Sequence, residues 1–375
     1  MGQKTETMRQ PNIELLRIVA MLMIITLHYL DKGGILVPFT QTQGITQKLP
    51  WVLEAFCMVS VNVYVLISGY FLTESKFRFK KVILIWAQVL FYSYVIGAVM
   101  WSLHLVPDAL KNFYDMIFVF LPVTASQYWF ATVYLLLFLV FPFLNAGIRH
   151  MTKGQHSALI IVLVVILSLW KSVIPMTVPI TNHSGMDLAW FVLLYILAAY
   201  IRKYPEVIKG KRVFYLAVYV LCIMISFGYA LLMTFVENRF GKLGGYSNNL
   251  YGYNSITMLI GAVCLFVFFL KWDCKLPLWM SRVIVGLGSC TFGVFLIHEH
   301  KFMRYYWPQL FKVHSMADSP FLYLHWLGTI LAVFLICAGI ERIRQLLFSL
   351  ITNRKFFKRF MDAFAPMEDR MNGVK

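Results

Sequence analysis

The chain has 375 residues, of which 60% are hydrophobic and only 14% are charged. This composition excludes an ordinary soluble domain and indicates an integral membrane protein. The net charge of +17 does not indicate a nucleic-acid partner, because the basic residues are dispersed over loops and the C-terminal tail, where anionic lipid headgroups are the expected neighbours. Membrane lipid is therefore the expected partner of these residues, and no nucleic acid is expected.

About ten predominantly apolar segments follow one another, each long enough to cross roughly 30 Å of hydrocarbon as a helix. In chain order they are 12–30, 51–73, 81–104, 127–148, 157–176, 186–203, 212–236, 254–272, 282–300 and 321–346. The loops between them are short, and no internal repeat is visible. The sequence predicts an all-α polytopic membrane domain over residues 1–350 with about ten transmembrane helices, followed by a basic cytoplasmic tail over residues 351–375.

Lysine and arginine are distributed unequally between alternate loops. With the N-terminus on the inner side, 24 of them fall on that side and 8 on the other. Because positive residues are retained on the cytoplasmic side of a membrane, both termini are predicted to be cytoplasmic.

The first segment carries a cation and an imidazole in the stretch "RIVAMLMIITLH", from Arg17 to His28, which is otherwise apolar apart from one threonine. Eleven helical steps of about 100° and about 1.5 Å place the two side chains on one face, about 16 Å apart. Ionisable groups inside a membrane are costly and usually face a cavity or a partner. Two structural explanations stay open: Arg17 can reach the inner interface with Glu14 as its ion-pair partner, and His28 can form a hydrogen bond between helices.

Three later stretches accompany this pattern of an arginine, ten residues and a histidine. The second segment ends in "VLISGYFL", with Ser68, Gly69 and Tyr70, and the basic "SKFRFKK" follows soon after it. The fourth contains "QYWFATVYLLLFLVFPFLN", a Trp-Phe helix that reaches Pro142, and the ninth ends in "CTFGVFLIHEH", with His298. In this order the four stretches resemble the membrane-bound acyltransferase 3 family. The chain is similar to its stand-alone members that act as surface-polysaccharide O-acetyltransferases in the bacterial cytoplasmic membrane.

The resemblance implies transfer of an acyl group, expected to be acetyl, from acyl-CoA as co-substrate. The acceptor would be a hydroxyl of a cell-surface carbohydrate or of its lipid-linked precursor, and no permanently bound cofactor is expected. The polyanionic nucleotide end of the donor is expected at the inner face, because a guanidinium can donate two hydrogen bonds to a phosphate at once. The expected donor-binding residues are Arg17, Arg78, Lys80 and Lys81.

The pantetheine arm of the donor is comparable in length to the separation of Arg17 and His28. The thioester would then reach His28, whose imidazole suits the removal of a proton from the attacking hydroxyl. Glu14, beside Arg17, completes the expected catalytic set. An outward position of His28 would let an acyl group made in the cytoplasm be delivered to an acceptor outside.

The expected acceptor-side residues carry less specific signals. Small residues in membrane helices often serve packing, and aromatic residues at a membrane boundary often form a belt rather than a sugar-binding platform. The candidates are Ser68, Tyr70, Tyr128, Trp129, His298 and Arg304. No metal site is expected at His298-Glu299-His300, because positions i and i+2 of a helix point about 200° apart.

Two other functions stay open. A secondary transporter or exporter of a polysaccharide intermediate would also use about ten helices, although such proteins often contain two related halves. A sensor or scaffold without catalysis would leave the cation and the imidazole on one helix face unexplained.

Overall fold

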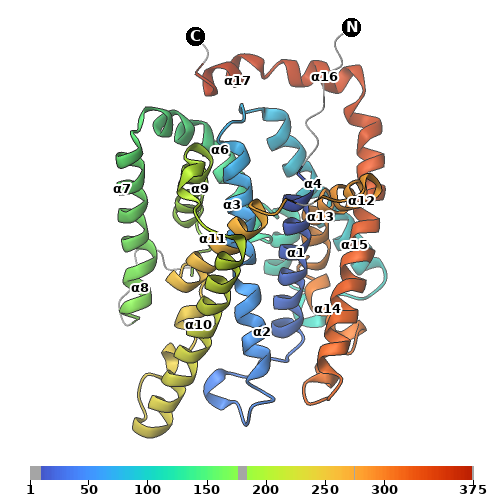
Figure 1. Cartoon of the computed structure of the whole chain (residues 1–375). Helices are drawn as coiled ribbons and strands as arrows, with labels where there is room; N and C mark the ends of the chain where they lie inside the picture. Colours follow the sequence, from blue (N-terminus) through green and yellow to red (C-terminus); the bar gives the residue numbers. More distant parts are fainter. Residues whose placement is uncertain (1–9, 176–183, 274, 374–375) are drawn as a thin grey trace.

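The structure is a computed structural model that describes residues 10–175, 184–273 and 275–373. Within these ranges the regular elements are helices, without strands. The first helix, α1 (Pro11–Lys32), begins at the end of the bundle where the last helix, α17 (Ala365–Met371), lies (Figure 1). This is the arrangement expected when both ends of the chain face the same side of a membrane.

Nine segments of the described residues are long and apolar enough to span a membrane. They are Pro11–Lys32, Leu49–Leu72, Phe79–Ser102, Trp129–His150, Lys153–Val173, Arg212–Phe240, Gly244–Leu270, Leu278–His298 and Leu322–Thr352. The remaining predicted segment, 186–203, forms the shorter helix α9 (Leu188–Lys203). It packs against α3 (Ser60–Leu72), α6 (Trp129–His150) and α7 (Lys153–Val164). The prediction of an all-α polytopic membrane protein is confirmed.

Several spans contain a break. The second consists of α2 (Leu49–Met58) and α3, the fifth passes through a π-helical turn (Val165–Leu169) into α8 (Trp170–Val173), and the seventh ends in α11 (Ile256–Leu270). The eighth of the nine consists of α12 (Leu278–Gly288) and α13 (Thr291–His298). Helix α13 ends two residues before the predicted boundary at residue 300. This difference changes where the side chain of Glu299 points.

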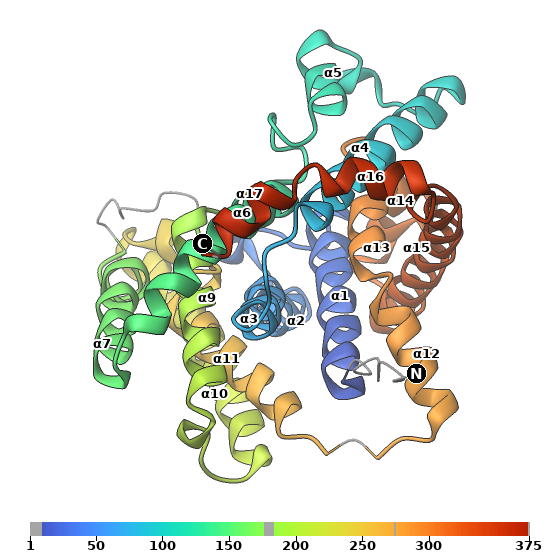
Figure 2. The same cartoon turned by 90° about the horizontal axis from the view of Figure 1, so that it is seen from above.

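Helix α1 lies inside the bundle. It packs against α2, α3, α11, α12, α13 and α15 (Leu322–Thr352), and Figure 2 shows it between α3 on one side and α12 and α13 on the other. Pro11 in its first turn lacks the backbone N–H that would stay unpaired there anyway. Because protein surrounds this helix, its polar side chains face other helices and cavities instead of lipid.

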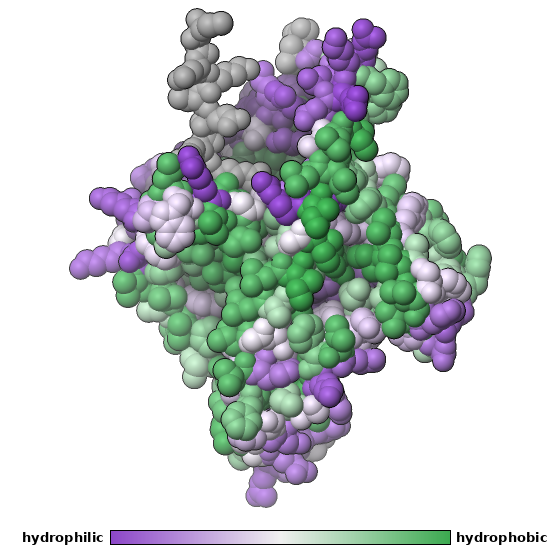
Figure 3. All heavy atoms as spheres, turned by 90° about the vertical axis from the view of Figure 1, so that its right-hand side faces the viewer, coloured by the Kyte–Doolittle hydropathy of each residue, from purple (hydrophilic) through white to green (hydrophobic). Residues whose placement is uncertain are grey.

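The lipid-facing surface is apolar. Helices α10 (Arg212–Phe240) and α15 expose large hydrophobic side chains along their lengths, including Leu221, Leu232, Leu324, Leu335 and Ile343. Figure 3 shows a broad hydrophobic band on the face that contains α15, with hydrophilic groups gathered toward the two ends. In water this surface would be unfavourable, and it fits a hydrocarbon environment.

The expected basic tail is partly helical and docked. Helices α16 (Lys355–Asp362) and α17 cross the end of the bundle where α4 (Phe79–Ser102) begins (Figure 2). Glu368 Oε1 accepts a 2.7 Å hydrogen bond from the Phe79 backbone N–H, and Asn372 Oδ1 accepts one of 2.7 Å from Phe77. Phe364 stacks on Phe79 with 5.3 Å between ring centroids. Residues 355–372 therefore cover part of this end of the bundle.

Candidate functional site

A large cavity opens at the end of the bundle where α1 begins. Its volume is about 760 Å³, and α1, α3, α4, α6 and α9 line it. Three cationic residues on its wall are Arg17, Lys81 and Arg202. Arg202 pairs with Glu74, and this hydrogen bond lowers the pKa of the Glu74 carboxyl below its usual value. Glu74 is therefore ionised at neutral pH and balances part of the positive charge at the mouth.

Arg17 and Glu14 form the ion pair that their spacing predicted. Arg17 Nε lies 3.5 Å from Glu14 Oε1, so the partnership exists, but Arg17 also lines the cavity. The Glu14 carboxylate sits against the backbone of α12, where a Cβ atom on Gly288 would lie 2.4 Å from Glu14 Oε2 and 3.0 Å from its Cβ. A glycine is required there for α1 and α12 to approach with Glu14 between them.

Replacing Gly288 with alanine is expected to destabilise the protein by about 1–3 kcal/mol, because the added methyl forces Glu14 and α1 away from α12. Thermal unfolding in detergent measures this as a lower midpoint. Gly286→Ala is the matched control on the same helix, since a Cβ there meets nothing within 4 Å and alanine favours the helical state by about 1 kcal/mol. Equal midpoints for the two variants would contradict the close approach of Glu14.

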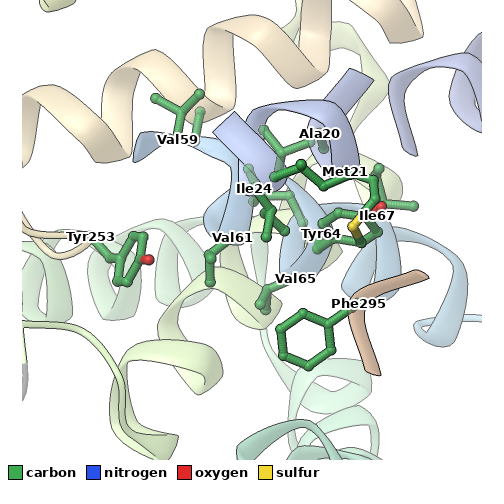
Figure 4. Packing of buried hydrophobic residues seen from close by; sticks show 14 of the residues in the cluster. Ala20, Met21, Ile24, Val59, Val61, Tyr64, Val65, Ile67, Tyr253 and Phe295 are labelled. Atoms are coloured by element: carbon green, nitrogen blue, oxygen red, sulfur yellow. The ribbon is translucent and has the colours of Figure 1, made fainter. Parts of the chain in front are cut away.

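A second, narrower cavity of about 190 Å³ continues from the first toward the middle of the bundle. The two share four wall residues, Arg17, Ser68, Ile85 and Tyr134. Beyond Arg17 the wall becomes apolar, with Met21, Ile24, Phe130, Phe292 and Phe295 on it. Figure 4 shows Met21 and Ile24 of α1 close to Tyr64 of α3, with Phe295 of α13 beside them. The combined tract has a charged mouth and a hydrophobic inner part.

His28 and His298 lie just beyond the inner end of this tract. His28 Nδ1 is 3.0 Å from His298 Nε2, and the His298 ring is 6.3 Å from the ring of Phe295, which lines the narrow cavity. The sequence stretches that carry these two residues are far apart, at opposite ends of the chain. The structure thus brings together two of the predicted site residues.

The hydrogen bonds of this pair fix which nitrogen carries each proton. His298 Nδ1 lies 2.6 Å from the Val294 carbonyl oxygen, which can only accept, so Nδ1 of His298 is the donor. In a neutral ring Nε2 of His298 then accepts, and His28 Nδ1 must donate to it. The remaining nitrogen of His28, Nε2, therefore holds an unshared electron pair and can take a proton.

Glu299 lies beside His28 and forms an ion pair with Arg304. Glu299 Oε2 lies 3.2 Å from His28 Nδ1, outside hydrogen-bond alignment, and Glu299 Oε1 lies 3.1 Å from Arg304 Nη1. The carboxylate is buried. A negative charge at this place stabilises an imidazolium when His28 gains a proton. Glu299 was not among the predicted site residues, whereas Arg304 was, as a residue for the acceptor.

The other predicted residues on α3 lie along the combined tract. Ser68 lines both cavities and donates a 2.9 Å hydrogen bond to the Tyr64 carbonyl oxygen. Tyr70 is buried near the mouth, where its hydroxyl accepts from Arg202 Nη1 at 3.1 Å. Tyr70 thus lies at the mouth end of the bundle, away from His28.

Two predicted aromatic residues lie at the start of α6: Tyr128 immediately precedes the helix, and Trp129 is its first residue. Tyr128 is fully buried, with its ring centroid 6.1 Å from that of Phe295. Trp129 stacks on Tyr253 with 5.8 Å between centroids. Tyr128 thus lies beside a residue of the narrow cavity, and Trp129 packs on the loop before α11.

The three basic residues predicted at the start of α4 are placed differently from one another. Lys81 lines the large cavity. The ammonium of Lys80 lies over the Phe357 ring of α16, at 5.8 Å from its centroid, and Arg78 is the residue that immediately precedes α4. Lys81 thus shares the wall of this cavity with Arg17.

His298, Glu299 and His300 do not act as a cluster. His298 bonds to His28, Glu299 faces Arg304, and His300 Nε2 donates to the Ser93 carbonyl oxygen at 3.2 Å. Across the described ranges no three His, Cys, Asp or Glu side chains gather in a way that could hold a metal ion.

Comparison with known proteins gives one match. A family model described as an acyltransferase domain matches residues 10–342. The matched range includes Arg17, the wall residues of both cavities, His28, His298 and Arg304, and it ends within α15. No curated protein and no solved structure matches the chain.

Proposed function

This chain belongs to the acyltransferase 3 family, and from that premise we propose that it transfers an acyl group, with acetyl as the expected one, from acyl-CoA to a hydroxyl group. The acceptor is a cell-surface carbohydrate or its lipid-linked precursor. The protein works as a multi-pass O-acyltransferase of the bacterial cytoplasmic membrane.

The observation that supports this proposal is the tract that runs from the charged mouth to Phe295, whose ring lies 6.3 Å from that of His298. The diphosphate of the donor binds near Arg17 and Lys81, which line the large cavity. The pantetheine arm occupies the apolar part between Met21, Ile24 and Phe295. A narrow hydrophobic channel suits a thin, uncharged arm, and its length brings the thioester to His28, about 16 Å from Arg17 along α1.

Nε2 of His28 takes the proton of the acceptor hydroxyl as its oxygen attacks the thioester carbonyl carbon. A carbon–oxygen bond forms, the tetrahedral intermediate collapses, and the carbon–sulfur bond breaks to release the CoA thiolate. The imidazolium then returns its proton to the sulfur, which restores neutral His28. Glu299 stabilises the imidazolium, and Arg304 pairs with that carboxylate and orients it.

The acceptor approaches from the side of His28 opposite to the donor tract. Trp129 and Tyr253, whose rings stack on each other, are the aromatic residues that would contact the C–H surface of a sugar ring. Lys301 pairs with Asp115 at 2.5 Å, which ties the loop after His300 to α5 (Phe113–Phe120). A fixed loop at this place holds Arg304 and Glu299 in register with His28.

Mass analysis of surface glycans from cells with and without the gene tests the proposal. Loss of the mass increment of one acetyl group per acceptor unit, restored by the wild-type gene, is the expected result. The purified protein in proteoliposomes should also consume acetyl-CoA when extracted glycan precursor is present. Unchanged acetylation together with accumulation of an unmodified intermediate inside the cell would instead indicate an exporter.

A further inference from the structure

A separate pocket lies between the end of α6 and α17. Its volume is about 310 Å³, and Ser75, Asn145, Arg149, His150 and Arg370 are among its wall residues. Three of these can carry positive charge, and they come from α6 and α17, two helices about 220 positions apart in the sequence. The pocket is therefore built by the fold and is not a run of neighbouring surface lysines.

The polar wall residues that are uncharged already have partners. Asn145 donates to the Leu72 carbonyl oxygen at 3.0 Å and accepts from the Tyr195 hydroxyl at 2.7 Å. Asn372 bonds to both backbone groups of Phe77. By contrast, no carboxylate or other acceptor in the described part of the chain pairs with the side chains of Arg149 and Arg370. Two guanidinium groups thus remain available to an anion from outside the chain.

This pocket adjoins the mouth of the donor tract. Ser75 lies on the wall of both the pocket and the 760 Å³ cavity that contains Arg17, Lys81 and Arg202. A donor whose diphosphate lies near Arg17 has its ribose and adenine further out, toward Ser75. The substituent carried by that ribose therefore comes close to Arg149 and Arg370.

We propose that this pocket binds the 3′-phosphate of the CoA ribose, with Arg149 and Arg370 as its ligands. The inference rests on the proposed function and extends it to the specificity for CoA over shorter nucleotides. A phosphomonoester carries close to two negative charges at neutral pH and offers three acceptor oxygens, which two planar guanidinium groups can bind in forked hydrogen bonds.

In this arrangement the docking of α17 holds Arg370 at the pocket. Glu368 and Asn372 flank Arg370 and hold the helix on the backbone of residues 77 and 79. These contacts fix Arg370 over the pocket. The C-terminal segment, which lies beyond the range matched by the family model, thereby contributes a ligand to the donor site.

The test compares acetyl-CoA with dephospho-acetyl-CoA, which lacks only the 3′-phosphate. Binding is measured by calorimetry on the full chain in phosphatidylcholine nanodiscs. Because a hydrogen bond to a charged group contributes about 1.5–3 kcal/mol, the wild type should bind acetyl-CoA about 10–100-fold more tightly. Arg370→Ala and Arg149→Ala should each lose most of this preference by weakening acetyl-CoA alone. Arg359→Ala, an exposed arginine of α16 outside the pocket, should retain it.

The outcomes separate this inference from the proposed function. Equal wild-type affinities for the two nucleotides would overturn the 3′-phosphate site and leave the acyltransferase proposal standing, whereas failure to bind either would contradict the proposed function itself. Arg149→Ala does not depend on α17 docking, so a parallel loss of both affinities in that variant would also overturn the inference. If the preference persists in both variants but they bind phosphatidylglycerol less well than the wild type, the pocket holds a lipid phosphate and the proposal is wrong.

Discussion

Replacing His28 with asparagine is expected to lower the rate of acyl transfer by about 100- to 10,000-fold, the contribution typical of a general base. Asparagine places an amide nitrogen close to the position of Nδ1, so the hydrogen bond to His298 Nε2 can persist, while the proton-accepting Nε2 is lost. The measurement is the initial rate of acetyl transfer to glycan precursor at saturating acetyl-CoA. Donor affinity, measured by calorimetry, should stay close to that of the wild type.

Two further variants test whether the loss of rate is specific to His28. His314→Asn changes an exposed histidine in the loop after α14 (Met303–Leu310) and should leave the rate unaltered. His298→Ala removes the acceptor of the hydrogen bond from His28 Nδ1 but leaves His28 Nε2 in place. It should therefore slow transfer less than His28→Asn does. A His28→Asn protein that folds and binds donor but transfers at the wild-type rate would contradict the assignment of His28 as the base.

The parts of the fold that depend on local sequence were predictable. Hydropathy alone located the nine candidate spans of the described residues, with boundaries that differ by up to ten residues, because the length and apolarity needed to cross a bilayer leave few alternatives. The helical period likewise put Arg17 and His28 on one face of α1. That Arg17 also pairs with Glu14 shows that the structural and the functional explanations of this residue do not exclude each other.

Glu299 could not be found by the same logic. Its neighbours were expected to continue a helix to residue 300, which would point Glu299 away from His298. Helix α13 instead ends at His298, with Glu299 as its C-cap, and the side chain turns back toward His28 and Arg304. A charged residue at the end of an apolar span, followed by an arginine five positions later, was the available signal.

Contacts between distant segments could not be predicted from the sequence either. Arg202 was counted only as a cytoplasmic positive charge, yet it lines the large cavity and bonds to Tyr70. The docking of α17 depends on side chains that bond to backbone groups of residues 77 and 79. Backbone groups are the same at every position, so they leave no pattern from which such pairing could be predicted.

Replacing Arg17 with alanine is expected to raise the KM for acetyl-CoA by about 10–100-fold, the loss of one or two charge-assisted hydrogen bonds to phosphate. The turnover number at saturating donor should change little, because Arg17 lies at the mouth of the tract, about 16 Å from His28. Steady-state kinetics over a wide range of donor concentrations separates the two effects.

Arg17→Lys sharpens the interpretation, since lysine keeps the charge beside Glu14 but not the planar fork that binds phosphate at two points. Its KM should fall between those of the wild type and the alanine variant. Arg239→Ala removes an exposed arginine at the far end of α10 and should leave the KM unaltered. If Arg17→Ala lowered the turnover number and left the KM unaltered, Arg17 would act on the reacting groups, and the donor could not lie along α1 in the proposed direction.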